Sequence, residues 1–331
     1  MTCNCTQLAN LLRWYYLPTM YSLEFCLGLL GNLLVILGYL FCLKGWKSSN
    51  VYLFNLAVSD LLFLCTLPRL ANCYARDRPE VSPGFCIANR LLLHVNLYSS
   101  ILFMAWVSAD RYLLVRHPLR QHPLLRRGVA VAVSALTWVA VCVQVAPLLV
   151  FIVRDMERSN WTRCSDFGSL SAGGDGGRHL AYSLALTATG YLLPLLALCL
   201  SSARIAAVLK AQAGLFQNRA DGFQRPQRMV LATAAMFLVL YAPYHVMRNV
   251  HIAHQAAAAA ASDHTCDRCV ESAYIVTRPI AFAHSVVNPA FYFFMGDHFR
   301  EQLIDRVKAL FRGRGSQQKQ SQGRESTTPV V

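Results

Sequence analysis

The sequence predicts an all-α membrane protein, a bundle of seven transmembrane helices followed by a short amphipathic eighth helix. Of the 331 residues, 55% are hydrophobic and only 15% are charged, whereas soluble domains carry about 25% charged residues. Seven long stretches are almost free of charge, and each approaches the roughly 20 apolar residues that a membrane-spanning helix needs. A soluble helical enzyme would instead show an apolar stripe on one side of each helix.

The seven stretches follow one another with short connections. They comprise residues 25–43, 52–67, 91–107, 129–153, 180–200, 229–247 and 273–295. We therefore expect an extracellular N-terminal segment at residues 1–16, a membrane bundle at 17–296, an amphipathic helix at 297–312 and a tail at 313–331. The first sixteen residues contain Asn4, Thr6 and Arg13 rather than an unbroken apolar run, so we expect no cleavable signal peptide.

The segment after the seventh stretch repeats apolar residues at helical spacing. Phe299, Leu303, Val307 and Leu310 share one side, and basic residues such as Arg300 lie on the other. Helices of this kind lie in the membrane interface, so we expect residues 297–312 to contact lipid on the inner leaflet. The tail from residue 313 is polar and rich in Gln and Ser, a composition typical of cytoplasmic disorder.

The basic residues are unevenly shared between the two sets of connections, and this predicts the orientation in the plasma membrane. With the N-terminus outside the cell, the inner connections are strongly positive and the outer ones hold most of the acids. The glycosylation sequons at Asn4 and Asn160 then lie outside. Six cysteines also lie outside, where disulfides persist: Cys3, Cys5, Cys86, Cys164, Cys266 and Cys269.

The net charge of +14 has the same origin. An excess of Lys and Arg on the inner side attracts anionic lipid headgroups. A nucleic-acid-binding protein would need a basic folded domain, and the sequence contains none. We therefore expect membrane lipid, and no nucleic acid, among the partners.

Each of the seven stretches carries a residue or motif that is unusual inside a membrane. In order these are Gly31-Asn32, Asp60, Asp110-Arg111-Tyr112, Trp138, Pro194, Pro243 and Asn288-Pro289 with Tyr292. Charged groups within a membrane are costly and are usually functional. With this set in this order, the chain resembles the rhodopsin-like (class A) G-protein-coupled receptors from about residue 16 to residue 312.

The resemblance implies a receptor that transmits an outer binding event to a heterotrimeric G protein, first of the inhibitory class and second of the phospholipase C-coupled class. Arrestin would bind the Ser- and Thr-containing tail. The implied signalling switch comprises Asp60, Asp110, Arg111, Tyr112, Asn288, Pro289 and Tyr292, in which Asp110 holds Arg111 at rest. Ser202 and Tyr241 depart from the pattern, because many members carry tyrosine and tryptophan there.

Five longer segments are similar to the carboxylate and nucleotide receptors of this class, and most of all to those that respond to succinate. They are residues 52–60, 97–103, 243–249, 274–279 and 296–300. The resemblance implies succinate, a small dicarboxylate, as the ligand. Receptors for 2-oxoglutarate or a nucleotide are the alternatives within the same class.

Charge chemistry indicates the same kind of ligand. Arg90, Arg248 and Arg278 lie near the outer ends of three different stretches, and His94 shares a helix face with Arg90. A single arginine could extend to lipid headgroups or pair with an acid such as Asp166. Three arginines with no acid beside them in sequence favour a shared anionic ligand. Because a guanidinium grips a carboxylate with two N–H groups, opposing arginines would clamp both ends of a dicarboxylate.

The resemblance implies the same ligand site. It comprises Arg90, His94, Arg248 and Arg278, with Tyr21 and Tyr74 as hydroxyl donors and Asp166 as an acid that tunes the site. His251 stands where relatives carry a further arginine, which would make the outer rim less basic at neutral pH.

The resemblance also implies covalent and ionic features. Cys86 is expected to bond Cys164, and a second bridge would join Cys3 or Cys5 to Cys266 or Cys269. A sodium pocket is implied at Asp60, Asn96 and Ser100, with Asn288 nearby. His284 replaces a smaller polar residue there, either as a neutral hydrogen-bonded ring or as a cation that competes with sodium.

Other functions have little support in the sequence. The chain lacks the G-x-x-x-x-G-K, H-E-x-x-H and G-x-S-x-G patterns, so we expect no enzyme and no cofactor. The seventh stretch contains no lysine, which excludes a retinal Schiff base. Cys266-x-x-Cys269 has no partner pair, so a disulfide is favoured over zinc. A carboxylate transporter is the alternative of a different class, although internal repeats typical of transporters are not visible.

Overall fold

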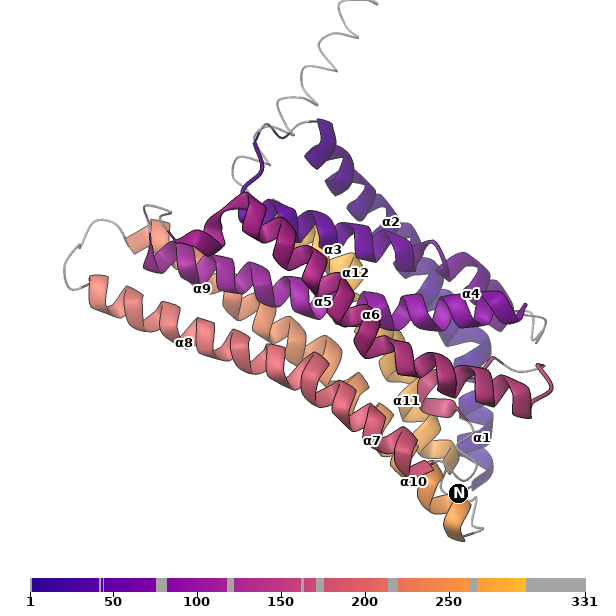
Figure 1. Cartoon of the computed structure of the whole chain (residues 1–331). Coiled ribbons are helices and arrows are strands. Elements are labelled where there is room, and N and C mark those ends of the chain that lie inside the picture. The colour runs from indigo at the N-terminus through magenta and orange to yellow at the C-terminus, as the bar shows by residue number, and fades with distance from the viewer. Residues whose placement is uncertain are drawn as a thin grey trace, which may run out of the picture.

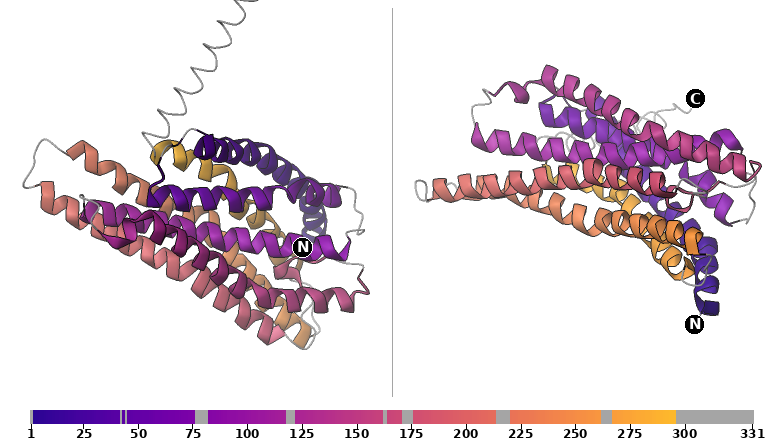
Figure 2. Two further views of the ribbon diagram at one scale, coloured as in Figure 1. Left: turned by 45° about the horizontal axis from the view of Figure 1, so that its top comes forward. Right: turned by 60° about the horizontal axis from the view of Figure 1, so that its bottom comes forward.

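A computed structural model describes residues 2–41, 43, 45–75, 82–117, 122–161, 164–170, 176–213, 220–261 and 267–295. Within these ranges every regular element is a helix, and the long helices run side by side as a bundle (Figure 1). Two further views show the same elongated arrangement from other sides (Figure 2). The predicted all-α architecture is confirmed.

Four helical segments form the first two predicted spans, and one helix forms each of the next two. The first span comprises α1 (Thr2–Leu11) and α2 (Leu17–Phe41), and the second comprises α3 (Ser48–Leu64) and α4 (Leu67–Ala75). The third span is α5 (Pro83–Arg116) and the fourth is α6 (Arg127–Arg158). The helices extend beyond the charge-free stretches because the polar headgroup region on each side of the hydrocarbon core tolerates charge.

The remaining three spans are each formed by two helices. The fifth consists of α7 (Gly176–Thr187) and α8 (Leu193–Ala213). The sixth consists of α9 (Ala220–Met236) and α10 (Ala242–Ala261), and the seventh of α11 (Asp267–Phe282) and α12 (His284–Met295). Among the described residues, two short 3-10 helices, Pro123–Leu125 and Phe167–Ser169, lie in connections.

In the described part of the chain, six helical stretches are long and apolar enough to cross a membrane. They are Cys5–Phe41, Ser48–Ala75, Pro83–Arg116, Arg127–Arg158, Gly176–Val208 and Arg228–Ala258. The seventh predicted span is helical as well, but a turn at Ala283 divides it into two shorter helices. Pro279 and Pro289 flank this turn, and each removes a backbone donor from the helix.

Three spans contain a π-helical turn that ends two residues before a proline. The turns are Leu12–Tyr16, Ala188–Leu192 and Phe237–Tyr241, and the prolines are Pro18, Pro194 and Pro243. A proline inside a helix lacks the N–H donor and its ring crowds the carbonyl group four residues earlier. In each case that carbonyl group lies within the wider π turn, which accommodates the proline without ending the span.

Large apolar side chains cover the outside of the bundle. Val143 of α6 is 69% exposed, and Leu136 and Leu30 are similarly exposed. Apolar surface of this extent is unfavourable in water. On the outside of a spanning bundle it is the surface that faces lipid.

The motif Gly31-Asn32 joins the first span to the seventh. A Cβ atom at Gly31 would lie 2.8 Å from Cγ of Pro289, so only glycine allows the helices to approach this closely. Nδ2 of Asn32 donates to the carbonyl oxygen of Ser285 over 2.8 Å. These contacts fix α2 against α12.

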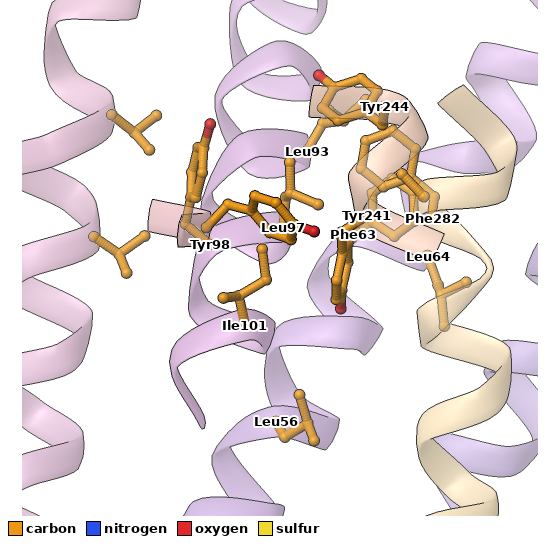
Figure 3. Close-up of a cluster of buried hydrophobic side chains, with 14 of the residues drawn as sticks. Leu56, Phe63, Leu64, Leu93, Leu97, Tyr98, Ile101, Tyr241, Tyr244 and Phe282 are labelled. Carbon is orange, nitrogen blue, oxygen red and sulfur yellow. The ribbon is translucent and has the colours of Figure 1, made fainter. Parts of the chain in front are cut away.

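A cluster of aromatic and aliphatic side chains fills the centre of the bundle (Figure 3). The rings of Phe63 and Phe282 lie 5.0 Å apart, and the ring of Tyr244 lies 6.1 Å from Phe282. Leu97 and Tyr98 contribute from α5. Along α5 this cluster lies inward of Arg90, so it forms the floor beneath the outer polar groups.

Two disulfides are present in the described part of the chain. Cys86 bonds Cys164, as the resemblance implied, and Cys5 bonds Cys269. The second bond decides between the pairings that the sequence left open for these two residues. Cys266 lies outside the described residues.

The N-terminal residues 2–11 form the helix α1, whereas the sequence led us to expect only an N-terminal segment. The Cys5–Cys269 bond and an ion pair between Arg13 and Glu271 hold it near α11. The hydroxyl of Tyr16 also donates to the carbonyl oxygen of Val276 over 3.0 Å. These tertiary contacts explain a helix that local sequence alone did not predict.

Several expectations fall on parts of the chain that are not described. The amphipathic helix at 297–312 and the tail at 313–331 lie outside the described residues, as do the side chains of Asn4 and Tyr292. Asn160 is described, and it is exposed just after α6 with φ of 50°. Asparagine is one of the few residues that adopt this left-handed conformation readily.

Candidate ligand site

The loop from Cys164 to Leu170 inserts into the bundle. The Cys86–Cys164 bond holds its start against α5, and the side chains of Asp166, Phe167 and Leu170 are buried. The backbone N–H of Gly168 donates to the hydroxyl of Tyr274 over 3.3 Å, and a Cβ atom at Gly168 would lie 2.6 Å from the Tyr274 ring. The close approach therefore requires glycine at this position.

Asp166 brings two of the predicted arginines together. Its Oδ1 lies 3.1 Å from Nη2 of Arg278 and 3.9 Å from Nη1 of Arg90. Arg90 Nη2 also donates to the carbonyl oxygen of Cys164 over 3.2 Å. The pairing with Asp166 that the sequence left as an alternative is thus present for Arg278, and at longer range for Arg90.

The two arginines decide the charge of the loop carboxyl group. Burial alone would raise the pKa of Asp166, but the positive charges of Arg278 and Arg90 outweigh burial and hold that pKa below its ordinary value. Asp166 is therefore ionised at neutral pH. The chain itself places a carboxylate on these two arginines.

The predicted tyrosines lie beside the same pair. Nη2 of Arg278 donates to the hydroxyl of Tyr74 over 3.0 Å. The ring of Tyr21 lies 6.2 Å from the ring of Tyr74, and its buried hydroxyl has no hydrogen-bond partner among the described residues. Tyr21 is thus a free hydroxyl next to Arg278, as a hydroxyl donor to a ligand would need.

Arg248 lies in a separate group of neutral partners. Its Nη1 donates to the hydroxyl of Tyr98 over 2.8 Å, and its other nitrogens donate to Ser183 and Thr187. The guanidinium also lies over the rings of Phe167 and Tyr244, 5.2 Å and 5.4 Å from their centroids. Arg90 and Arg278 thus share Asp166, whereas Arg248 lies among neutral groups.

Four residues around Arg248 escaped the sequence analysis as site residues: Tyr98, Ser183, Thr187 and Asn249. Two of them had a signal. Ser183 and Thr187 are four residues apart in an otherwise apolar span, so they lie on one helix face. Tyr98 and Asn249 belong to segments that carried the resemblance, but the contact of Tyr98 with Arg248 and the contacts of Asn249 with α7 join distant parts of the chain.

His94 lies one turn inward of Arg90, as expected. Its Nδ1 lies 2.8 Å from the carbonyl oxygen of Arg90, and its ring meets the Phe167 ring at a centroid distance of 5.2 Å. His251, by contrast, is buried and stacks on Tyr274 at 5.2 Å. The expectation that His251 lies on an outer rim is therefore wrong, because the inserted loop and α11 cover this position.

Glu24 is a buried acid that the sequence analysis missed. It lies on the inward face of α2, is only 3% exposed, and neither carboxyl oxygen has a hydrogen-bond partner among the described residues. The available signal was an acid directly before the first uncharged stretch. It adjoins that stretch, whereas the helix already begins at Leu17.

Asp60 lies at the centre of a polar network between three helices. Its Oδ1 accepts from Asn96 over 2.9 Å and from Ser100 over 3.3 Å, and its Oδ2 accepts from Asn288 over 2.8 Å. The structure thus brings together the residues of the implied sodium pocket. In the described part of the chain, no cluster of three or more His, Cys, Asp or Glu side chains suits a metal ion.

His284 adds its ring to this network. Nε2 lies 3.1 Å from Oδ1 of Asn96 and 3.5 Å from Oδ1 of Asp60. Nδ1 lies 2.7 Å from the carbonyl oxygen of Ala281. Both ring nitrogens therefore face oxygen atoms.

The inner end of α5 carries the Asp110-Arg111 pair. Oδ2 of Asp110 lies 3.8 Å from Nη2 of Arg111, and Tyr112 follows in a half-buried position. Asp110 also accepts a hydrogen bond from the hydroxyl of Ser48, a partner that the sequence analysis did not identify. In the fourth span, Trp138 donates to Asn55 over 2.9 Å, and Pro289 is buried in the seventh.

Comparison with known proteins gives consistent results. Residues 31–292 match the model of the family described as 7 transmembrane receptor (rhodopsin family). The chain is 42% identical to mouse Succinate receptor 1 over 302 residues, which cover 91% of this chain and 93% of the relative. It is 43% identical to rat Succinate receptor 1 over 316 residues, 93% and 95% of the two chains. Rat 2-oxoglutarate receptor 1 is 31% identical over 306 residues, 92% and 88%.

Proposed function

Because the chain belongs to the rhodopsin family of 7 transmembrane receptors, we propose that it is a receptor for extracellular succinate that activates heterotrimeric G proteins. Membership of this family makes it a multi-pass membrane protein and a receptor rather than an enzyme. The identity of the ligand is supported by similarity to Succinate receptor 1 of mouse and rat over more than nine-tenths of the chain.

The single observation that carries the proposal is the burial of Arg248. Its side chain is fully buried, and among the described residues no carboxylate oxygen lies within 4.0 Å of the guanidinium. Its hydrogen-bond partners are the neutral groups of Tyr98, Ser183 and Thr187. A buried charge without a counter-ion is strongly unfavourable, so an anion that reaches Arg248 is bound favourably.

The second position for an anion lies at Arg90 and Arg278. These arginines hold the carboxylate of Asp166, which supports their ability to hold a ligand carboxylate. A small dicarboxylate would place one end at Arg248 and the other at Arg278, where it competes with Asp166. Tyr74 and Tyr21 would donate from the same side.

Binding at the outer end activates the receptor only if the active state binds the ligand more tightly than the resting state. The ligand would join α10, which carries Arg248, to α11, which carries Arg278. A shift of these helices would be transmitted past the central aromatic cluster to the network of Asp60. Release of Arg111 from Asp110 would then open the inner face to a G protein, first of the inhibitory class.

The remaining expectations belong to the same proposal. The N-terminus lies outside the cell, and glycans are carried at Asn4 and at the exposed Asn160. Residues 297–312 lie on the inner leaflet, in contact with lipid. Arrestin binds the Ser- and Thr-containing tail after activation.

A ligand panel tests the proposal. Dicarboxylates of three to six carbons, 2-oxoglutarate and nucleotides are applied to membranes that contain the full-length chain, and agonist-driven nucleotide exchange on G proteins is measured. We expect succinate to be the most potent. A stronger response to 2-oxoglutarate or a nucleotide would overturn the choice of ligand. Uptake of labelled succinate without nucleotide exchange would favour a carboxylate transporter and overturn the receptor function.

A further inference from the structure

Two hydroxyl-bearing residues of α7 hold Arg248 from one side. Ser183 and Thr187 lie one helical turn apart, on the face that meets α10. Nε of Arg248 donates to Oγ of Ser183 over 3.1 Å. Nη2 donates to the Ser183 carbonyl oxygen over 3.2 Å and to Oγ1 of Thr187 over 2.9 Å. The fifth and sixth spans are thus joined through the guanidinium of Arg248.

Asn249 ties the two hydroxyls together. Its Nδ2 donates to Oγ1 of Thr187 over 2.9 Å, and its Oδ1 accepts from Oγ of Ser183 over 2.6 Å. Thr187 in turn donates to the carbonyl oxygen of Ser183 over 2.9 Å. A hydroxyl group has one donor and two acceptor sites, so every site of the Thr187 hydroxyl is occupied and its orientation is fixed.

The hydrogen bonds of Arg248 limit what it can offer to a ligand. A guanidinium carries five N–H donors. In the described part of the chain, Nε uses its one donor, Nη2 uses both of its donors, and Nη1 uses one on the Tyr98 hydroxyl at 2.8 Å. One N–H group on Nη1 remains. The two-point grip expected from the sequence is therefore not available from Arg248 in this arrangement.

We propose that Ser183, Thr187 and Asn249 determine which length of dicarboxylate the receptor accepts, because they fix the position and direction of Arg248. The proposal rests on the proposed function, in which Arg248 binds one carboxylate and Arg278 with Arg90 binds the other. When both positions are fixed, only a ligand with the matching separation between its carboxylates reaches both. These three are positioning residues, since they act through Arg248 and need no contact with the ligand.

The partners that fix Arg248 are neutral, and this is useful for binding an anion. Hydroxyl and amide groups orient a guanidinium without neutralising its charge, whereas a carboxylate partner would remove the attraction for an anion. Arg278 shows the contrast, because its charge is shared with Asp166. Arg248 is therefore both oriented and uncompensated, which is the combination that length discrimination needs.

Thr187→Val tests the proposal, because valine has nearly the same shape and no hydroxyl. We compare the potency of succinate, with four carbons, and glutarate, with five, in agonist-driven nucleotide exchange at matched surface expression. Loss of a hydrogen bond to a charged group weakens binding by about tenfold. We expect that loss for succinate and a smaller loss for glutarate, because a released Arg248 can shift toward the longer ligand. The ratio of the two potencies should fall severalfold.

Two variants provide controls, and one provides a second test. Thr187→Ser keeps the hydroxyl and should restore the ratio. Thr189→Val removes the same kind of hydroxyl two residues away, where it is exposed and donates to the carbonyl oxygen of Ala185, and should leave the ratio unchanged. Ser183→Ala should lower the ratio if Thr187→Val does not reach the cell surface.

The outcomes separate the two proposals. An equal loss of potency for both ligands, or no loss for either, would overturn the positioning role of these residues while the receptor function stands. A fall in the ratio that Thr187→Ser does not reverse would also overturn it. If the unmodified chain responds to neither dicarboxylate, the proposed function itself is wrong.

Discussion

Replacement of Asp166 by asparagine should make the receptor less stable without ligand and more sensitive to succinate. The carboxylate of Asp166 lies 3.1 Å from Arg278 and 3.9 Å from Arg90, and all three side chains are buried. Asp166→Asn keeps the shape of the side chain and removes its charge. Two buried arginines then lack a counter-ion, and the position of the carboxylate is open to a ligand carboxylate without a competing charge.

The magnitude follows from the burial of the pair. Removing one partner from a buried ion pair costs about 3–5 kcal/mol. Asparagine still accepts a hydrogen bond, so we expect a loss near the lower value, about 3 kcal/mol, in the ligand-free receptor. If a ligand carboxylate recovers half of this, succinate binds more tightly by about 1.5 kcal/mol, or roughly tenfold.

Thermal unfolding of the detergent-solubilised receptor, with and without succinate, measures both effects. The variant should unfold at a lower temperature without ligand and should be stabilised more by succinate. Glu271→Gln is the matched control, because it removes an outer ion pair with Arg13 and Arg268 that does not touch the ligand site. Unchanged or weaker succinate affinity in Asp166→Asn would refute the reasoning and would mean that Asp166 chiefly orients Arg278.

Further predictions concern pH, the outer clamp, the core and the inner switch. Since the pKa of Asp166 is lowered, its ion-pair contribution is present above the ordinary aspartate pKa and is lost only as pH falls through the lowered value. Thermal stability should therefore show no titration of Asp166 between about pH 6 and 8. A difference in unfolding temperature between the unmodified receptor and Asp166→Asn that varies across this range would contradict the assignment. Arg278→Ala should weaken the succinate response tens-fold or more in a concentration–response assay, because truncating one member of a buried charge pair costs about 2–5 kcal/mol. Arg278→Lys should restore only part of the lost potency. Unchanged potency in Arg278→Ala would remove this residue from the site. Because both nitrogens of His284 face oxygen atoms, agonist affinity of the unmodified receptor should be insensitive to replacement of sodium by N-methylglucamine. The affinity should become sensitive to sodium in His284→Asn. Equal sensitivity of the two receptors would show that the ring does not act as the cation beside Asp60. Ser202→Tyr should raise basal or agonist-driven exchange severalfold at matched surface expression, since a hydrogen bond to Tyr292 is worth about 0.5–1.5 kcal/mol; no rise would mean that the fifth helix reaches Tyr292 by another route or not at all.

The spans were predictable because lipid imposes a simple rule on composition. A stretch without charge that is long enough to cross the membrane has few alternatives to a helix. The ends of the helices were less predictable, because polar headgroups tolerate the residues that mark a boundary in sequence. Glu24 shows the difficulty, since an acid beside the uncharged stretch lies inside the helix and faces the bundle.

The site was predictable in its chemistry and less so in its partnerships. Three arginines on three helices indicated an anion site, and the structure places each in the half of its span that lies toward the two disulfides. Which arginine pairs with Asp166 depends on the loop that the Cys86–Cys164 bond carries into the bundle, and loop insertion leaves no periodic signal. The neutral partners of Arg248 likewise come from residues about 65 and 150 positions away along the chain, and contacts over such separations leave no local pattern in the sequence.

The π turn at Ala188–Leu192 has a consequence for any insertion or deletion in the fifth span. Such a turn holds one residue more than an α-helical turn, and successive residues of a helix are separated by about 100° around its axis. Deleting one residue from Ala188–Leu192 would therefore convert the wide turn into an α-helical turn and keep the two halves of the span facing as before. The same deletion in α8, between Leu193 and Ser202, would rotate Ser183 and Thr187 against Ser202 by about that angle. The π turn is thus the place in the fifth span where the loss of a residue leaves Ser183 and Thr187 directed at Arg248.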